Sequence, residues 1–371
     1  MRVLHVAQPR EGGVAGYLVA AARDQVARGW DVTVACPAEG QLATRLREHG
    51  IAHEAWEAVR SPGPSAFGEA RALGRIVAAK RPDVLHLHAS KAGLAGRLLP
   101  RQRTPVLFQP HAWSWLAVTG ALRHATVAWE RHAARRTGLF VCVAEAEAAQ
   151  GRERGVKGEY TVVRNGVDLT RFRPADDEAR MAARAALGVG RDVPLVVCVG
   201  RITRQKGQDV LLDAWRRVRQ ECPTAELALV GGGDLYESTK ATGAPGARFT
   251  GPVDDVRGWL AAADLVALPS RWEGLPLTAL EAFATGRPVV ASAVPGLIET
   301  LTPEVGELVQ PEDPGALAWA LTRRLQAPAL MRAEGKEALR RSQGFDLRHT
   351  YDRLADATTE VAERRKMAVN R

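Results

Sequence analysis

The sequence lacks the features of a membrane-spanning or disulfide-bonded protein. Its longest apolar runs, such as Leu195–Val199 and Leu265–Leu268, are too short to cross a bilayer, and no signal-peptide pattern precedes them. The 4 cysteines lie far apart and form no CxxC pair. Cys36, Cys142 and Cys198 stand at or near the ends of apolar runs, which is typical of reduced core cysteines. We therefore expect a cytoplasmic protein.

Aromatic residues are also few, at 5% of the chain, and no RNA- or DNA-binding motif is present. The net charge of +9 is nevertheless uneven, because residues 1–170 hold 23 Lys+Arg against 15 Asp+Glu, whereas residues 171–371 hold 28 against 27. The first half is therefore expected to face an anionic partner, either a phosphorylated metabolite or an anionic membrane surface. A basic nucleic-acid-binding protein is a remote alternative, and an arginine-rich genome would explain the charge without any partner.

Short apolar runs alternate with longer amphipathic stretches along the whole chain. This alternation predicts α/β domains with parallel sheets, and the near-continuous apolarity of the runs predicts helices on both sheet faces. The predicted strands are residues 3–7, 32–35, 84–87, 106–108, 139–143 and 160–163 in the first half, and 195–199, 227–230, 249–250, 265–268 and 289–291 in the second.

A chain of 371 residues exceeds what one core usually supports, so two domains are expected. A polar stretch near 168–180 interrupts the alternation and predicts the linker. We assign residues 1–170 to a Rossmann-like first domain and 171–345 to a second, with 346–371 as a terminal helix and tail. One face of that helix is apolar (Leu347, Tyr351, Leu354, Thr358, Val361), so it can pack on its own domain or return to the first.

Ligands of doubly wound sheets bind beyond the carboxyl ends of the strands, so the residues that follow each strand are the candidates for chemistry. Gly12 and Gly13 follow the first strand, where a glycine turn lets backbone N–H groups approach a phosphate at a helix start. A plain strand-to-helix turn would also need glycine. Gly200 and Arg201 end a strand of the second half, and Lys206 lies five residues after Arg201. Two cations on one short loop can clamp a diphosphate without a metal, although a solvated basic loop would look the same.

Two glutamates stand in an otherwise almost apolar segment of the second half. Glu273 falls in the turn after a strand and Glu281 in the following helix, with Gly274, Leu275, Pro276 and Leu277 between them. Charged side chains are rarely placed among apolar neighbours without a partner. These carboxylates are suited to accept hydrogen bonds from the hydroxyls of a sugar and a ribose, while two unrelated surface glutamates remain the simpler alternative.

Three histidines follow or end strands in the first half. His86 and His88 alternate on one strand and so resemble a metal pair, but no third ligand with suitable spacing is evident, and we predict no metal site. His111, in a Pro-His turn, can contact a substrate or be structural. The acidic pairs 176–177 and 254–255 are expected to be solvated or to cap helices rather than to bind a metal.

Taken in order, these motifs resemble glycosyltransferase family 4, the retaining enzymes of the GT-B fold that use nucleotide sugars. The resemblance spans nearly the whole chain and rests on Gly12-Gly13, His111, residues 165–168 (NGVD), the Gly200 to Lys206 loop and the Glu273/Glu281 pair. It implies two facing Rossmann-like domains and transfer of a hexose from a UDP-sugar or GDP-sugar without a metal or other cofactor. Where relatives often have serine before the glutamate, this chain has Val143-Ala144-Glu145, which removes one hydroxyl contact.

The resemblance also implies roles for individual residues. Arg201 and Lys206 would bind the donor diphosphate, with Gly200 in the same loop, and the backbone of Gly12 and Gly13 would approach the phosphates. Glu281 would hold the ribose hydroxyls. Glu273, with the backbone of 274–277, would orient the transferred sugar, and His111 would lie beside the reacting centre.

The stretches 87–93 (LHASKAG) and 110–113 (PHAW) resemble the bacterial branch that builds exopolysaccharides or lipid-linked glycans, which implies a glycan or polyprenyl-diphosphate-linked acceptor. The basic segment 123–136 fits docking on the anionic inner face of the plasma membrane, or is an ordinary exposed helix. A glycosyltransferase acting on a small natural product and a non-hydrolysing sugar-nucleotide epimerase remain alternatives. The sequence does not indicate the oligomeric state.

Overall fold

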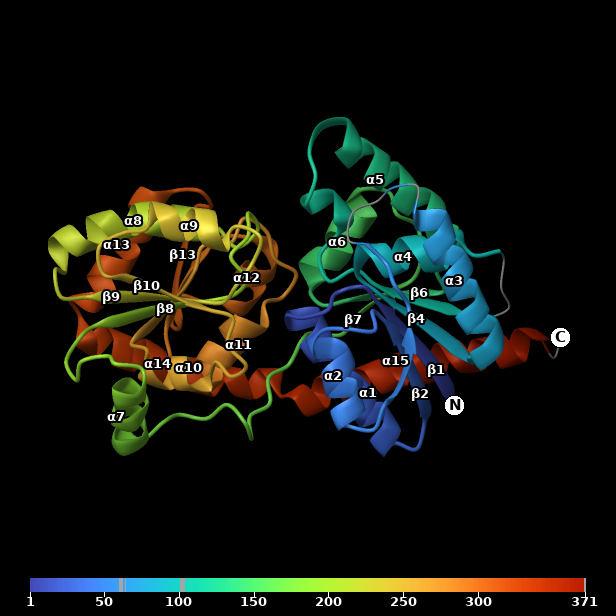
Figure 1. The fold of residues 1–371 in the computed structure, drawn as a ribbon, viewed down its shortest axis with the longest axis horizontal. Helices are drawn as coiled ribbons and strands as arrows, with labels where there is room; N and C mark the ends of the chain where they lie inside the picture. Colours follow the sequence, from blue (N-terminus) through green and yellow to red (C-terminus); the bar gives the residue numbers. More distant parts are fainter. Residues whose placement is uncertain (60–62, 64, 101–103, 370–371) are drawn as a thin grey trace. The chain divides into compact units, whose positions relative to one another are not determined.

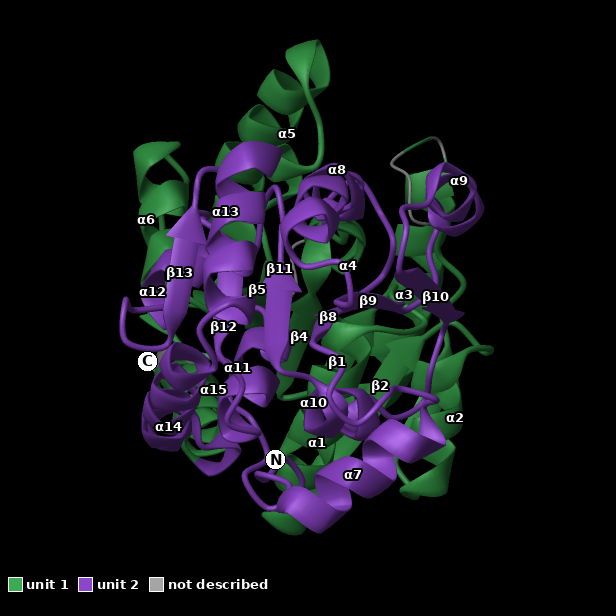
Figure 2. Ribbon diagram, turned by 90° about the vertical axis from the view of Figure 1, so that its left-hand side faces the viewer, with its two compact units in different colours: residues 1–164, 349–371 green, residues 165–348 purple. Residues whose placement is uncertain are grey.

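The computed structural model describes residues 1–59, 63, 65–100 and 104–369. The chain divides into two compact units, residues 1–164 together with 349–371, and residues 165–348 (Figures 1 and 2). Each unit is a parallel β-sheet covered by helices on both faces, so the predicted fold class of two doubly wound α/β domains is confirmed.

The first unit contains a seven-stranded sheet in the order β3-β2-β1-β4-β5-β6-β7, with every neighbouring pair parallel. Its central strands are buried throughout because both faces are covered. The strands are β1 (Arg2–Ala7), β2 (Asp31–Cys36), β3 (Ala52–Ala55), β4 (Val84–His88), β5 (Val106–Gln109), β6 (Leu139–Cys142) and β7 (Tyr160–Val162), and the helices are α1 (Gly13–Ala27), α2 (Gln41–Glu48), α3 (Ser65–Lys80), α4 (Ala89–Leu98), η1 (Ser114–Leu116), α5 (Gly120–Ala133), η2 (Ala134–Arg136) and α6 (Glu145–Glu153).

The second unit contains a six-stranded parallel sheet in the order β10-β9-β8-β11-β12-β13. Figure 1 shows α8 and α13 on one face of this sheet and α10 and α14 on the other. The strands are β8 (Leu195–Val199), β9 (Glu226–Val230), β10 (Ala247–Gly251), β11 (Leu265–Leu268), β12 (Val289–Ser292) and β13 (Gly306–Val309), and the helices are α7 (Asp177–Ala186), α8 (Gln208–Glu221), α9 (Tyr236–Thr242), α10 (Arg257–Ala262), α11 (Leu277–Ala284), α12 (Pro295–Thr300), α13 (Pro314–Leu325), α14 (Pro328–Ser342) and η3 (Gln343–Phe345).

The last helix, α15 (Leu347–Val369), belongs to the first unit from His349 onward. Thr350 Oγ1 donates a hydrogen bond to the Arg164 carbonyl at 2.8 Å, and the Tyr351 ring lies 6.2 Å from that of Tyr17 on α1. Its apolar face therefore packs against the first unit. Residues 370–371 of the predicted tail lie outside the described residues.

The unit boundary lies at Arg164/Asn165, six residues before the predicted 170/171. Residues 165–168 group with the second unit because Val167 donates to the Phe345 carbonyl at 2.8 Å and accepts from Leu347 at 3.1 Å. The predicted linker also contains the start of α7, where the Asp176 carboxylate accepts a hydrogen bond from the Ala179 N–H at 2.8 Å. The capping role expected for this acidic pair is thus confirmed.

Candidate functional site

The second unit has its topological switch point between β8 and β11, which are adjacent strands whose chain connections run to opposite sides. Ligands of doubly wound sheets bind outside the carboxyl ends of strands at such a point. The loop 200–207 follows β8 and the loop 269–276 follows β11. The two motifs that the sequence singled out in this half therefore begin side by side.

The structure brings Lys206 and Glu273 together at this point. Lys206 Nζ lies 2.5 Å from Glu273 Oε1, and Ser270 Oγ donates to the same carboxylate oxygen at 2.7 Å. Glu273 is only 8% exposed, so its charge depends on these partners. Gln205 Nε2, donating to the Trp272 carbonyl at 3.0 Å, joins the two loops a second time.

Arg271 braces the same two loops, although nothing in the sequence singled it out. Its guanidinium donates to Asp209 at 2.7 and 2.9 Å, to the Arg204 carbonyl at 2.8 Å and to Glu312 at 2.8 Å. Its backbone N–H donates to the Gln205 carbonyl at 2.8 Å. A guanidinium with three kinds of acceptor has a fixed orientation, and Arg271 therefore positions the loop that carries Lys206.

Gly207 allows the loop after β8 to approach the loop after β11. Its φ of +67° lies in the left-handed region, and a Cβ there would stand 2.1 Å from the Pro269 carbonyl oxygen. Only glycine satisfies both conditions. Gly200 and Arg201 stand at the start of this loop, where the Ile202 N–H donates to the Gly232 carbonyl at 2.7 Å and ties the loop to the end of β9.

Glu281 lies on α11, the helix that starts at Leu277 after Gly274, Leu275 and Pro276. Burial raises the pKa of its carboxyl group to about 7, while Arg171 lowers that pKa and Asp255 adds to the rise. The carboxylate therefore changes charge near neutral pH. The start of α11 is held by Asn165, whose Nδ2 donates to the Leu275 carbonyl at 2.7 Å, so the NGVD motif positions the predicted sugar-binding backbone.

The first unit has its own switch point between β1 and β4. Gly12 and Gly13 follow β1, where Gly12 is the N-cap of α1 and Gly13 its first residue, so the N–H groups of the first helical turn lie at the carboxyl edge of the sheet. His111 follows β5, the strand next to β4. The predicted residues of this half thus gather at one edge of the first sheet.

The turn at His111 is held in a conformation that few residues adopt. His111 has φ +51° and Ala112 has φ +82°, both in the left-handed region. The buried Glu147 on α6 holds this turn, since its Oε1 accepts from the Ala112 N–H at 2.6 Å and its Oε2 from the Val143 N–H at 2.8 Å. A strained backbone kept in place by a buried carboxylate is typical of functional sites, and sequence reasoning missed Glu147.

A third histidine, which the sequence did not reveal, lies close to His86 and His88. His5 on β1 pairs in register with His86 on β4, and ring nitrogens of His5, His86 and His88 all lie within 4.8 Å of one another. All three are fully buried, and burial lowers the pKa of His5 to about 4 and the pKa values of His86 and His88 well below 6.5. Neutral imidazoles are competent metal ligands, so His5 is a candidate third ligand that the spacing along the sequence did not indicate.

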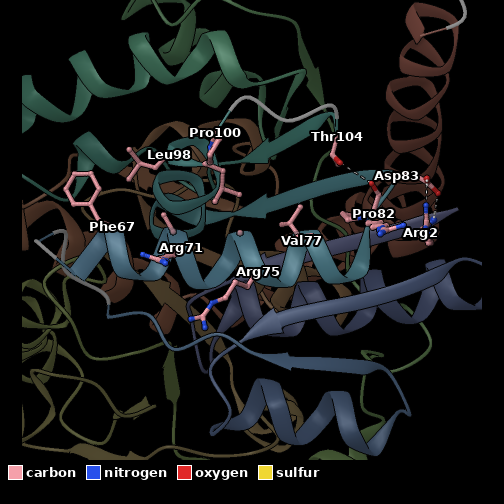
Figure 3. A pocket seen from close by; sticks show the side chains of 15 residues that line it. Arg2, Phe67, Arg71, Arg75, Val77, Pro82, Asp83, Leu98, Pro100 and Thr104 are labelled. Carbon is pink, nitrogen blue, oxygen red and sulfur yellow. Dashed lines mark hydrogen bonds and ion pairs between the residues drawn. The ribbon is translucent and has the colours of Figure 1, made fainter.

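A cavity of about 1000 Å³ lies along α3 in the first unit, and Figure 3 shows the side chains that line it. Phe67 and Leu98 line it on one side, and the Arg2–Asp83 ion pair stands at its far end. Arg2 and Asp83 lie at the amino ends of β1 and β4. The cavity therefore reaches the edge opposite to His111 and is not part of the candidate site.

The chain matches two family models. Residues 11–171 match the model described as Glycosyltransferase Family 4, and residues 193–327 match the one described as Glycosyl transferases group 1. A D-inositol 3-phosphate glycosyltransferase from Jonesia denitrificans is 31% identical over 324 residues, which cover 80% of this chain and 76% of the relative. The chain belongs to glycosyltransferase family 4. The family predicted from the motifs is thus confirmed.

Other relatives of this family 4 chain are only partly covered. A D-inositol 3-phosphate glycosyltransferase from Streptomyces avermitilis is 33% identical over 75% of the chain, and the match spans 64% of the relative. A second partly covered relative, from Corynebacterium glutamicum, is named GDP-mannose-dependent monoacylated alpha-(1-6)-phosphatidylinositol monomannoside mannosyltransferase. It is 38% identical over a match that covers 46% of this chain and 48% of the relative.

Solved structures show the GT-B fold. Anabaena HepE (Alr3699) in complex with UDP and glucose matches with a TM-score of 0.84 at 23% identity, covering 97% of this chain and all of that one. Sucrose-phosphate synthase from Thermosynechococcus elongatus matches with a TM-score of 0.80 at 23% identity, covering 97% of this chain and 98% of that one. Among the described residues of this family 4 chain, no helix combines the length and apolarity needed to span a membrane.

Proposed function

We propose that the chain is a retaining glycosyltransferase that transfers a hexose from a UDP-sugar or GDP-sugar without a metal. The observation that carries this proposal is the Lys206–Glu273 pair at the switch point of the second unit. A cation and a sugar-orienting carboxylate meet there, at the place where doubly wound sheets bind nucleotides. Arg201 begins the same loop, and Glu281 follows on the next helix.

The donor assignment is supported by the chemistry of these side chains. Lys206 and Arg201 suit a diphosphate leaving group, whose charge grows as the glycosidic bond breaks, and the carboxylates of Glu281 and Glu273 suit hydroxyls of the ribose and the sugar. Solved neighbours named above include a complex with UDP and glucose, and a relative is named as GDP-mannose-dependent. The site residues offer positioning and charge stabilisation, which fits same-face attack assisted by the leaving phosphate.

The acceptor is proposed to be a glycan or a polyprenyl-diphosphate-linked sugar, reached by peripheral docking of the cytoplasmic enzyme on the inner face of the plasma membrane. The surplus of Lys and Arg in residues 1–170 supports an anionic acceptor. A second candidate is an inositol phosphate, because several relatives are named D-inositol 3-phosphate glycosyltransferases. The polyprenyl-diphosphate-linked sugar and the inositol phosphate are both phosphorylated, and both fit the charge.

The first experiment is calorimetric titration of UDP, GDP, ADP and their sugar conjugates in the presence of EDTA. Micromolar binding of one nucleotide family is expected, and Glu281→Ala should weaken it strongly. If no nucleotide binds, or if binding appears only after a divalent cation is added, the proposed metal-independent donor site is wrong.

The acceptor is tested next with the donor that binds. Product formation is measured with a polyprenyl-diphosphate-linked sugar, with D-inositol 3-phosphate and with a small aglycone, and the anomeric configuration of the product is read by NMR. A retained configuration on one of the two phosphorylated acceptors is expected. Conversion of the donor without any acceptor would favour the epimerase instead, and an inverted product would contradict retention.

A further inference from the structure

Two fully buried histidines and the partly buried His111 form one continuous hydrogen-bonded chain in the first unit. His5 Nε2 lies 2.7 Å from Gln25 Oε1, His5 Nδ1 lies 2.9 Å from His88 Nε2, and His88 Nδ1 lies 3.1 Å from His111 Nε2. Gln25 is on α1, His5 on β1, and His88 at the end of β4. Four elements of the first unit thus contribute one residue each to a chain that ends at the predicted substrate residue.

The protons of this chain follow from the orientation of the Gln25 amide, whose Oε1 faces His5 Nε2. Gln25 Oε1 is only an acceptor, so His5 Nε2 must carry a proton. A neutral imidazole has one proton, and His5 Nδ1 is therefore an acceptor for a proton on His88 Nε2. By the same step His88 Nδ1 accepts from a proton on His111 Nε2, which leaves His111 Nδ1 unprotonated.

The placement of the protons requires that all three rings are neutral at physiological pH, and their lowered pKa values meet this requirement. Burial lowers the pKa of His5 to about 4 and of His111 to about 3, and lowers that of His88 well below its usual value. The nearest rings add no charge, because burial also keeps Tyr17 protonated by raising its pKa.

We propose that Gln25, His5 and His88 are positioning residues that fix His111 as the Nε2–H tautomer and so present its Nδ1 as a hydrogen-bond acceptor for a substrate hydroxyl. The left-handed turn held by Glu147 fixes the backbone of His111, and the histidine chain fixes its ring. His111 then recognises a hydroxyl donor and does not offer an N–H to a phosphate oxygen. This proposal rests on the proposed function only for the identity of the hydroxyl, which would belong to the donor sugar or the acceptor.

His86 separates this role from metal binding. The centroid of its ring lies 4.0 Å from that of His88, and the two rings are tilted by 31°. Neither nitrogen of His86 makes a hydrogen bond of ordinary geometry in the described structure. Gln109 is nevertheless close enough to raise the pKa of His86, which burial lowers. Both ring nitrogens of His5 and both of His88 are used in the hydrogen-bonded chain, so a metal held by His5, His86 and His88 would have to replace a hydrogen bond at each of these two rings. Metal binding and the histidine chain therefore exclude each other, and only the metal needs His86.

The test is the tautomer of His111 in the ligand-free protein, read from the nitrogen shifts of ¹⁵N-labelled imidazoles, with His111→Asn to assign the signal. Protonated Nε2 and unprotonated Nδ1 are expected at pH 7. Gln25→Met and His88→Leu should mix the tautomers. Tyr17→Phe and His86→Leu, which leave the chain intact, should not, and melting curves check that each variant is folded.

Activity provides the second measurement. His88→Leu is expected to lower kcat about tenfold, the value of one lost neutral hydrogen bond, with UDP or GDP affinity unchanged, and His88→Gln should restore most of it because an amide can both donate and accept. A protonated Nδ1 in the wild type, a tautomer unchanged in both Gln25→Met and His88→Leu, or a stoichiometric metal in the purified protein would overturn the proposal. If no acceptor is ever glycosylated, the proposed function fails while the nitrogen shifts still decide the tautomer.

Discussion

Glu281 is the residue whose charge is most sensitive to pH in the proposed donor site. Burial raises the pKa of its carboxyl group to about 7, so it is mostly ionised at pH 8 and mostly protonated at pH 6. A carboxylate accepts two ribose hydroxyl protons better than a carboxylic acid does. We therefore predict that the Kd of the nucleotide sugar rises about tenfold from pH 8 to pH 6.

The measurement uses the sugar conjugate, because a free nucleoside diphosphate would itself titrate in this range. Glu281→Gln is the matched control, since the amide keeps the shape of the side chain and has no charge to lose. Its Kd should be weaker at pH 8 and flat with pH. An equally steep pH profile in Glu281→Gln would show that another group is titrating.

The Lys206–Glu273 ion pair is expected to have a structural role and a functional role, and two variants can measure these roles separately. Lys206→Ala leaves a carboxylate that is 8% exposed, and among the described residues its side-chain partners are then Ser270 and Gln205. We predict a loss of about 1–3 kcal/mol in the free energy of unfolding and a decrease in kcat of about 10²–10³. The double variant Lys206→Met/Glu273→Gln should regain the stability but not the activity. Recovery of both would mean that the pair serves only the fold.

At the scale of elements, the loops after β8 and β11 can approach each other closely because Gly207 has no side chain. Gly207→Ala would place a Cβ 2.1 Å from the Pro269 carbonyl at a φ of +67°. We expect a lower melting temperature and at least a tenfold weaker nucleotide affinity, because the Lys206 loop must move away from Glu273. Gly258→Ala on α10 is the control, since nothing lies within 4 Å of its added Cβ, and it should leave both values unchanged or raise stability slightly. Equal effects of the two substitutions would contradict this account.

The elements that the sequence predicted are those with continuous apolar runs. β3 and β13 were missed because each is a short edge strand with polar residues, such as Glu54 and Glu307, in the run. The terminal strand β10 was predicted too short for the same reason, because four of its five residues are only partly buried. The interior strands could be predicted from the sequence alone, because strands buried on both faces consist almost entirely of apolar residues.

The candidate site was predictable where two motifs follow adjacent strands, and not where contacts depend on strand order. The rule on carboxyl ends placed Lys206 and Glu273 at one edge of a sheet. The contact of His5 with His86 depends on β1 lying beside β4, and the sequence does not reveal this because the two residues are 81 positions apart. Glu147 was equally hidden, because its partners at Ala112 and Val143 are backbone N–H groups that leave no pattern in the sequence.

At the scale of the whole molecule, the buried histidines make the two units respond differently to acid. His5, His86, His88 and His111 all have pKa values lowered by burial, so the unfolded chain binds protons between about pH 6.5 and pH 4 that the folded chain does not. Stability therefore falls as pH decreases through this window, by about 2 kcal/mol between pH 7 and pH 5 for a histidine such as His5, whose pKa in the folded protein is about 4. Carboxyl groups with lowered pKa values, such as that of Glu69, lose their contribution only below their ordinary range, near pH 4.5.

We therefore predict that the first unit loses protection before the second when the pH is lowered from 7 to 5. Native-state hydrogen exchange, corrected for the intrinsic rate at each pH, should show faster opening of β1 and β4 while β8 and β11 change little. His88→Gln removes one of the four titrating groups and should make the loss of protection in the first unit smaller. Uniform loss of protection in both units, or a first unit that is unchanged at pH 5, would show that the histidines do not carry the acid sensitivity.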